Sequence, residues 1–261
     1  CVVVKNWGRS IDEMVIREPA ALKIAFGENP KRIYKEREEM PTTRMAVAAL
    51  LRETLIKAQD YKAQKEKALE SGEHFARSLK YEALLPVLAG EIPLKAHAHR
   101  ADDILTAIRL AQEFDVPLIL NHCTEGHLVA DYIQKSGYPA IVGPSMWAKR
   151  KIELSNQSLE TAAKLKQKGV KVAITTDHPV TLIQYLPLCA GLAMLEGLSF
   201  EDTLRAITIN AAEIIGVSDR VGSLEVGKDA DVAIFDGNPL QTLTKTLYTI
   251  IQGEIVYRNC N

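Results

Sequence analysis

The sequence has little of what marks disulfide-stabilised, membrane-spanning or nucleic-acid-binding proteins. Its four cysteines (Cys1, Cys123, Cys189 and Cys260) are scattered without paired spacing, which favours free thiols and a reducing cytoplasm over a disulfide scaffold. A formal net charge of −1 gives no electrostatic reason to bind nucleic acid or an anionic membrane. No apolar run is long enough to cross a bilayer. We therefore expect a cytoplasmic globular protein.

A hydrophobic fraction of 47% over 261 residues is sufficient for one large domain, or for one domain with a small appendage. Apolar runs alternate with amphipathic helical patterns, which predicts a parallel α/β fold. No run is followed by a glycine-rich fingerprint, so a dinucleotide or P-loop site has no support. Either an open doubly wound sheet or an incomplete (β/α)8 barrel fits the six predicted strands, at residues 2–5, 20–26, 92–97, 116–121, 139–142 and 170–175.

Two further regions have a distinct character. Thr42 is predicted to cap a long helix whose second half, beyond about residue 58, is polar and projects into solvent until Gly72 ends it. Shorter helices are predicted near 125–135 and 155–168.

From 219 to 257, short apolar runs are broken by Gly, Asp and Asn, which indicates a small β unit. The predicted domains are therefore 1–217 and 218–261.

Candidate metal ligands lie where predicted strands end. His97 and His99 follow one strand, His122 ends the next, and Asp177 follows the strand at 170–175. Carboxyl ends of parallel strands meet at one rim, and imidazoles with a carboxylate suit Zn²⁺, or Mn²⁺ and Fe²⁺ with more oxygen ligands. A lone strand-end histidine more often packs or hydrogen-bonds, but three strand ends with ligand-type residues favour a metal site. His127 is expected to be structural.

Four segments carry a resemblance to a known family. KAHAHRADDI, LILNHCTEGH, VAITTDHP and VGSLEVGKDADVAIFDGNP resemble the amidohydrolase superfamily, in particular its bacterial imidazolonepropionase-like members. The resemblance implies a distorted (β/α)8 barrel with one or two divalent metals at its carboxyl-end rim. It also implies that residues 218–261 form part of a small β-sandwich beside the barrel.

Carried over by position, the resemblance implies a ligand set. His97 matches a metal ligand, and His122 matches a ligand or a residue that polarises the substrate. Asp177 matches a residue that binds metal and acts as the catalytic base. A bridging ligand is implied on the strand at 20–26 or just beyond it, and either Lys23 or Glu28 could supply it. The implied metal is Zn²⁺ first, with Fe²⁺ or Mn²⁺ as alternatives.

The implied reaction is hydrolysis of a non-peptide carbon–nitrogen bond, such as that of a cyclic amide, by metal-activated water. The implied partner is a small-molecule amide, and homo-oligomer formation stays open. His99 and Arg100 are interpreted as rim residues that face the substrate, because a guanidinium matches carboxylate geometry. Lys149 and Arg150 are interpreted as a solvated loop rather than an anion site.

One departure from the family pattern affects these expectations. The family's first strand carries His-x-His, and no such motif precedes His97. We therefore expect that strands 1 and 2 are absent, that the chain is truncated, and that it holds substoichiometric metal with little or no activity. The alternative is a non-catalytic relative that serves as a scaffold or assembly subunit.

Overall fold

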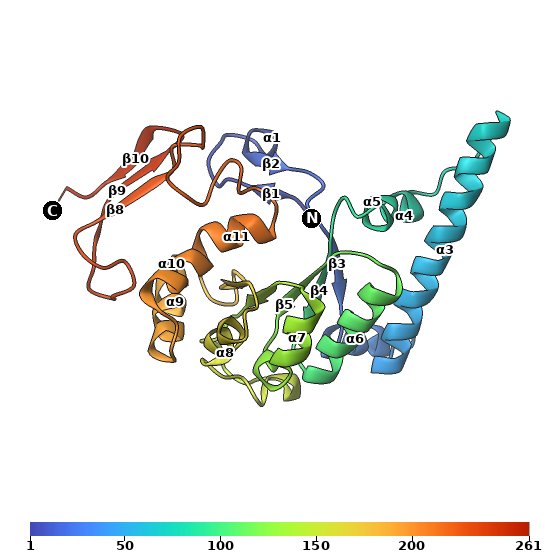
Figure 1. The fold of residues 1–261 in the computed structure, drawn as a ribbon, viewed down its shortest axis with the longest axis horizontal. Helices are drawn as coiled ribbons and strands as arrows, with labels where there is room; N and C mark the ends of the chain where they lie inside the picture. The colour runs from blue at the N-terminus through green and yellow to red at the C-terminus, as the bar shows by residue number, and fades with distance from the viewer. Residues whose placement is uncertain (261) are drawn as a thin grey trace.

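A five-stranded parallel sheet forms the centre of the computed structural model, which describes residues 1–260 (Figure 1). This arrangement confirms an α/β fold with a parallel central sheet. Consecutive strands are neighbours throughout, so each connection is a crossover of the kind that parallel pairing requires. The connection from β3 to β4 is the longest and contains α2 to α5. In sheet order the strands are β3 (Leu22–Ala25), β4 (Leu94–Ala98), β5 (Leu118–His122), β6 (Ala140–Val142) and β7 (Val172–Ile174).

The first predicted strand is not part of this sheet. β1 (Val3–Val4) pairs antiparallel with β2 (Val15–Arg17) across the one-turn helix α1 (Ile11–Met14). The expectation of six parallel strands is therefore wrong. β1 instead has its backbone partner in β2, which follows after a connection too short for a parallel crossover, so the two strands pair antiparallel.

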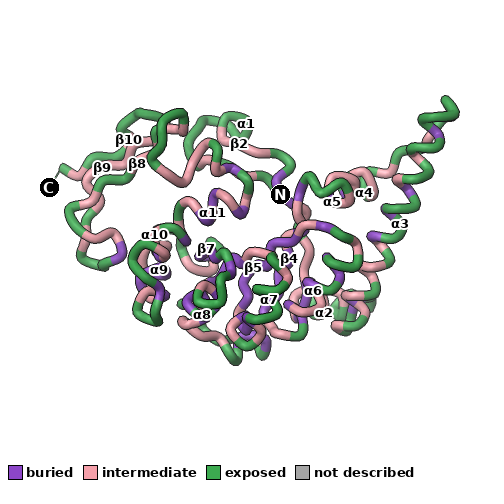
Figure 2. The backbone as a smooth tube through the Cα atoms, in the orientation of Figure 1, coloured by how far each residue is buried: buried purple, intermediate pink, exposed green. Residues whose placement is uncertain are grey.

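The two faces of the sheet have different partners. Leu94, Ala96 and Ala98 of β4 alternate onto one face, where they belong to the main core with Ile104 and Ile108 of α6 (Ala101–Glu113). The other face carries a smaller cluster, made of Ile119, Ile141, Ala173 and Ile214. Ile214 ends α11 (Ile209–Ile214), so this helix covers part of that face. Figure 2 shows the buried residues concentrated in the strands and the inner sides of these helices.

The longest helix, α3 (Arg44–Ser71), extends beyond the rest of the molecule (Figure 1). Its N-cap is Thr43, whose hydroxyl accepts from the N–H of Ala46 at 3.1 Å, so the predicted cap at Thr42 is off by one residue. Gly72 ends the helix with a left-handed φ of 68°, a conformation that costs glycine little.

Two predicted helices are shorter than their sequence patterns suggest. The predicted helix at 125–135 is split into a 3₁₀ turn, η1 (Gly126–Leu128), and α7 (Ala130–Ser136). The predicted helix at 155–168 is helical only in α8 (Thr161–Gln167), which the 3₁₀ turn η2 (Ile152–Leu154) precedes. The others are α2 (Glu28–Glu36), α4 (Leu79–Glu82), α5 (Leu85–Leu88), η3 (Ile183–Tyr185), α9 (Leu186–Leu195) and α10 (Phe200–Ile207). Within residues 1–260, none of the helices is both long enough and apolar enough to span a membrane.

The strands predicted within 219–257 are present as a separate antiparallel sheet. Its order is β10 (Glu254–Arg258), β9 (Thr246–Ile251) and β8 (Val232–Phe235). The amino-terminal hairpin is tied to the loop that leads into this sheet, because Lys5 Nζ lies 2.6 Å from Asp229 and 2.7 Å from Asp231. The amino-terminal segment is thereby joined to the segment that precedes β8, and β1 and β2 lie between the parallel sheet and the antiparallel sheet (Figure 1).

Candidate metal centre

Three histidines converge at the carboxyl ends of β4 and β5. His97, His99 and His122 are all buried, and each offers one ring nitrogen within 4.8 Å of those of the others. Their ring centroids are 4.5 to 4.8 Å apart. Ligand nitrogens around a tetrahedral Zn²⁺ are about 3.4 Å apart, given Zn–N bonds of about 2.0–2.1 Å. A small contraction would therefore bring the three nitrogens to ligand spacing.

The strand ends explain why these rings meet. His97 lies on β4 opposite Asn121 of β5, so His122 would point to the other face if the strand continued its alternation. His122 instead has a left-handed φ of 77°, and Cys123 has a φ of 47°. This conformation is uncommon for residues other than glycine and often occurs at functional sites. It breaks the alternation where the third imidazole joins the other two.

Hydrogen bonds determine which ring nitrogen of His122 carries the proton. Its Nδ1 lies 2.8 Å from the carbonyl oxygen of Gly143, which can only accept, so Nδ1 carries the proton. Its Nε2 then accepts from the Asn121 side-chain amide at 2.8 Å. A histidine that donates from one nitrogen to a carbonyl and presents the other as a lone pair has the arrangement of a metal ligand.

His97 is held in the same protonation pattern. Lys151 Nζ donates to Asn29 Oδ1 at 2.5 Å, and since ammonium has no lone pair, this bond fixes which end of the amide faces His97. Asn29 Nδ2 therefore donates to His97 Nε2 at 3.2 Å. His99 Nδ1 lies 2.7 Å from the Thr124 hydroxyl, which leaves Nε2 of His99 available.

Burial keeps the three rings neutral. Burial first, and then the neighbouring His122 and His99, lower the pKa of His97 to about 2. The pKa of His99 falls to about 3, again through burial first and His122 second. Burial also lowers the pKa of His122. Neutral imidazoles are the form that binds Zn²⁺, so this donor set fits a divalent metal. A metal bound at Nε2 of His97 and His122 would take the place of the amide groups of Asn29 and Asn121.

The other predicted ligands lie around the three rings without joining them. Asp177 follows β7 with a φ of 50° and an exposed side chain, and its charge opposes the lowering of the His122 pKa. Lys23 is beside Lys95 in the register of β3 and β4. Burial and then Lys95 lower the pKa of Lys23. The roles assigned to Asp177 and Lys23 remain predictions.

Two further candidates are engaged elsewhere. The carboxylate of Glu28 accepts from the N–H of Glu153 at 3.0 Å. Arg100 binds Asp102 through Nε at 2.9 Å and through its second nitrogen at 3.0 Å. An anionic substrate group would therefore have to compete with Asp102 for this guanidinium.

Several residues around the histidines were not identified from the sequence. Asn29 and Asn121 contact ring nitrogens, and Glu153 Oε1 lies 3.9 Å from His99 Nε2. Asn121 precedes His122 directly, which could have indicated a role. Glu153 has no comparable signal, since its position depends on how the loop after β6 crosses the rim.

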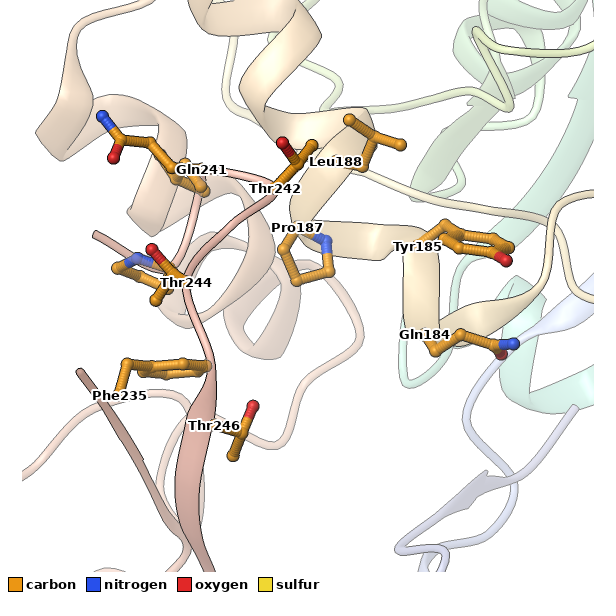
Figure 3. A pocket seen from close by; sticks show the side chains of 11 residues that line it. Gln184, Tyr185, Pro187, Leu188, Phe235, Gln241, Thr242, Thr244 and Thr246 are labelled. Carbon is orange, nitrogen blue, oxygen red and sulfur yellow. The ribbon is translucent and has the colours of Figure 1, made fainter. Parts of the chain in front are cut away.

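A separate cavity of about 270 Å³ lies away from these histidines, between the η3–α9 segment and the β8–β9 connection (Figure 3). Its lining is neutral, with Tyr185 and Phe235 as its aromatic residues and three threonines. None of the three histidines lines it. Because it has no metal-ligating cluster and no charged side chain, the cavity does not contribute to the candidate metal centre.

Comparisons with known proteins agree with this description. The family model described as "Amidohydrolase family" matches residues 31–256. A crystal structure of an amidohydrolase from Thermotoga maritima is 40% identical with a TM-score of 0.95, and the match covers 99% of this chain and 68% of that one.

Curated relatives are matched over smaller parts of their length. Amidohydrolase tasK of Hapsidospora irregularis is 27% identical over 84% of this chain and 24% of its own length. An imidazolonepropionase of Fusobacterium nucleatum is 29% identical over 66% of this chain and 41% of its own length. The chain thus spans less than half the length of these relatives. On the family model and the Thermotoga structure together, this chain belongs to the amidohydrolase family, whose members are metal-dependent.

Proposed function

We propose that the protein hydrolyses a non-peptide carbon–nitrogen bond with a divalent metal held at His97, His99 and His122, Zn²⁺ being the first candidate. The observation that carries the proposal is the meeting of three neutral imidazoles at one rim of the sheet. Relatives named imidazolonepropionase support a cyclic amide as the first substrate class to test. The strands β3–β7 would then be part of a (β/α)8 barrel, and β8–β10 part of a β-sandwich.

The chain's own residues have distinct roles in this proposal. A bound metal would lower the pKa of water and polarise the scissile carbonyl. The Gly143 carbonyl keeps the proton of His122 on Nδ1, and the amides of Asn29 and Asn121, which contact Nε2 of His97 and His122 in this structure, would give way to the metal. Asp177 takes a proton from the attacking water at its carboxylate and returns it to the leaving nitrogen. Its exposed position after β7 leaves that carboxylate accessible to a substrate.

The proposal predicts that Asp177→Asn lowers turnover of cyclic amides at least 100-fold, the range that general-base catalysis contributes, while metal content and melting temperature are retained. The measurements are a hydrolysis assay on a panel of cyclic amides, elemental analysis and thermal unfolding. Asp115→Asn is the matched control, because Asp115 is also exposed, has the same φ of 50°, and lies at the opposite end of the sheet, before β5.

Two results would refute parts of the proposal. Full turnover by Asp177→Asn would exclude Asp177 as the base. A wild-type protein that binds no divalent metal would exclude metal-dependent hydrolysis by this chain and favour a non-catalytic role.

A further inference from the structure

Glu153 is a carboxylate buried at the rim beside the three histidines. Its side chain is 0% exposed, and it lies in η2, in the long connection between β6 and α8. Buried acids need partners, because an isolated buried charge is costly. Glu153 Oε2 accepts from the N–H of Glu28 at 2.8 Å, and Glu28 Oε1 accepts from the N–H of Glu153 at 3.0 Å. These reciprocal bonds fix η2 to the first turn of α2.

The backbone beside the carboxylate leaves room for it. Gly27, just before α2, has a φ of 79°, and a Cβ there would lie 2.4 Å from Glu153 Oε2. Any larger residue would displace the carboxylate or the helix start. The location of the Glu153 carboxylate is thus determined by two main-chain contacts and by the absence of a side chain at residue 27.

The second oxygen of Glu153 faces the metal centre. Oε1 lies 3.9 Å from His99 Nε2 and 3.5 Å from Lys151 Nζ. Within residues 1–260, Glu153 is the carboxylate that comes within 4.0 Å of a ring nitrogen of the three histidines. Three neutral imidazoles supply no negative charge, so a dication among them would need a nearby anion in this buried setting.

We propose that Glu153 is a positioning residue that lies on the metal-facing Nε2 side of His99 and supplies the charge that balances a divalent cation at the three histidines. The inference rests on the proposed function, since it presumes that the histidines bind metal. It adds a residue from the β6–α8 connection, a segment far from the histidines in sequence. Glu153 acts through its charge beside the site, and it need not touch the substrate.

Cobalt titration of the protein tests this role. Co²⁺ reports its coordination by visible absorption, so affinity and ligand geometry are measured together without an activity assay. Glu153→Gln keeps an oxygen for the N–H of Glu28 but removes the charge. We expect Co²⁺ to bind at least tenfold more weakly to this variant with an altered spectrum, since loss of a residue that supports a metal ligand typically costs 10–100-fold in affinity.

Glu125→Gln is the matched control. Glu125 is also a buried rim carboxylate, and it accepts from the N–H of Ala101 at 2.7 Å and from the Asn156 amide at 2.8 Å. Its side chain contacts none of the three rings in the described residues, so its Co²⁺ affinity should stay within twofold of wild type. Equal affinity and spectra for wild type and Glu153→Gln would overturn the inference. Wild type without any Co²⁺ binding would overturn the proposed function as well.

A second variant keeps the test decisive if Glu153→Gln does not fold. Glu153→Asp retains the charge but withdraws it from His99 by one methylene. We expect weaker Co²⁺ binding and a change in the ¹⁵N resonances of the His99 ring, with the His127 ring unchanged. Unaltered His99 resonances together with wild-type affinity in this variant would refute the positioning role.

Discussion

Gly143 illustrates how one residue supports both the fold and the site. Its φ is 125°, and a Cβ there would lie 2.2 Å from the backbone oxygen of Thr175. β6 and β7 therefore approach too closely at their ends for any side chain. The same residue offers its carbonyl to His122 Nδ1. A displacement at this position would reach the metal centre through that hydrogen bond.

Gly143→Ala is predicted to destabilise the protein by roughly 1–3 kcal/mol from backbone strain alone, with a further cost from moving Thr175. Gly137→Ala is the control, because Gly137 has a φ of 73° but open space where a Cβ would be, and it should cost about 1 kcal/mol. Urea unfolding of both variants measures the difference. Equal losses of stability would show that the contact with Thr175 does not restrict this position.

At the scale of elements, the polar end of α3 is stabilised by an aromatic cluster rather than left free. Tyr61 is 7% exposed, and its ring packs against Phe75 at 5.0 Å and Tyr81 at 5.4 Å between centroids. Its hydroxyl donates to Glu82 at 2.7 Å and accepts from the N–H of Ser78 at 3.0 Å. One side chain therefore connects α3 to the segment that includes α4.

Tyr61→Phe should remove both bonds and leave the N–H of Ser78 without its partner, at a cost of about 1–3 kcal/mol. We expect the loss to be local, with faster hydrogen exchange over residues 78–82 and little change in the core strands. Tyr34→Phe is the control, since the Tyr34 hydroxyl makes no hydrogen bond within residues 1–260. Unchanged exchange over 78–82 would contradict this assignment.

At the scale of the whole molecule, ion pairs join the amino-terminal segment to the segment that precedes the antiparallel sheet. Lys5 is 10% exposed at its side chain and binds both Asp229 and Asp231, while Arg220 binds Asp229 at 2.8 Å. The hydrogen bond from Lys5 is the main cause that lowers the pKa of Asp229, with burial opposing it. The link is electrostatic and should respond to pH.

Lys5→Met is predicted to cost about 1.5–3 kcal/mol, the range for hydrogen bonds to charged groups, and to speed proteolysis between residues 218 and 231. Because the folded-state pKa of Asp229 is depressed, its contribution is present above the ordinary value of 3.8 and is lost as pH falls through the folded pKa. The difference between wild type and Lys5→Met should therefore shrink in acid. Arg9→Met, at a side chain 93% exposed, is the control, and an equal effect there would exclude the specific link.

The sequence by itself determined the features that depend on local periodicity. Alternating apolar runs and amphipathic helices predicted the parallel sheet, and the glycine after residue 71 predicted the end of α3. Histidines directly after strands predicted a cluster at one rim, because parallel strands all end at the same edge. Such patterns are properties of neighbouring residues, so they can be recognised without the fold.

Tertiary structure alone decided which groups complete the site. Asn29 and Glu153 are 124 positions apart along the chain, yet Lys151 and Glu28 hold both beside the histidines. The left-handed backbone at His122 and the inclusion of His99 with the other two rings likewise depend on how β4, β5 and β6 end together. These features arise from contacts between distant segments, whose energies no local pattern records.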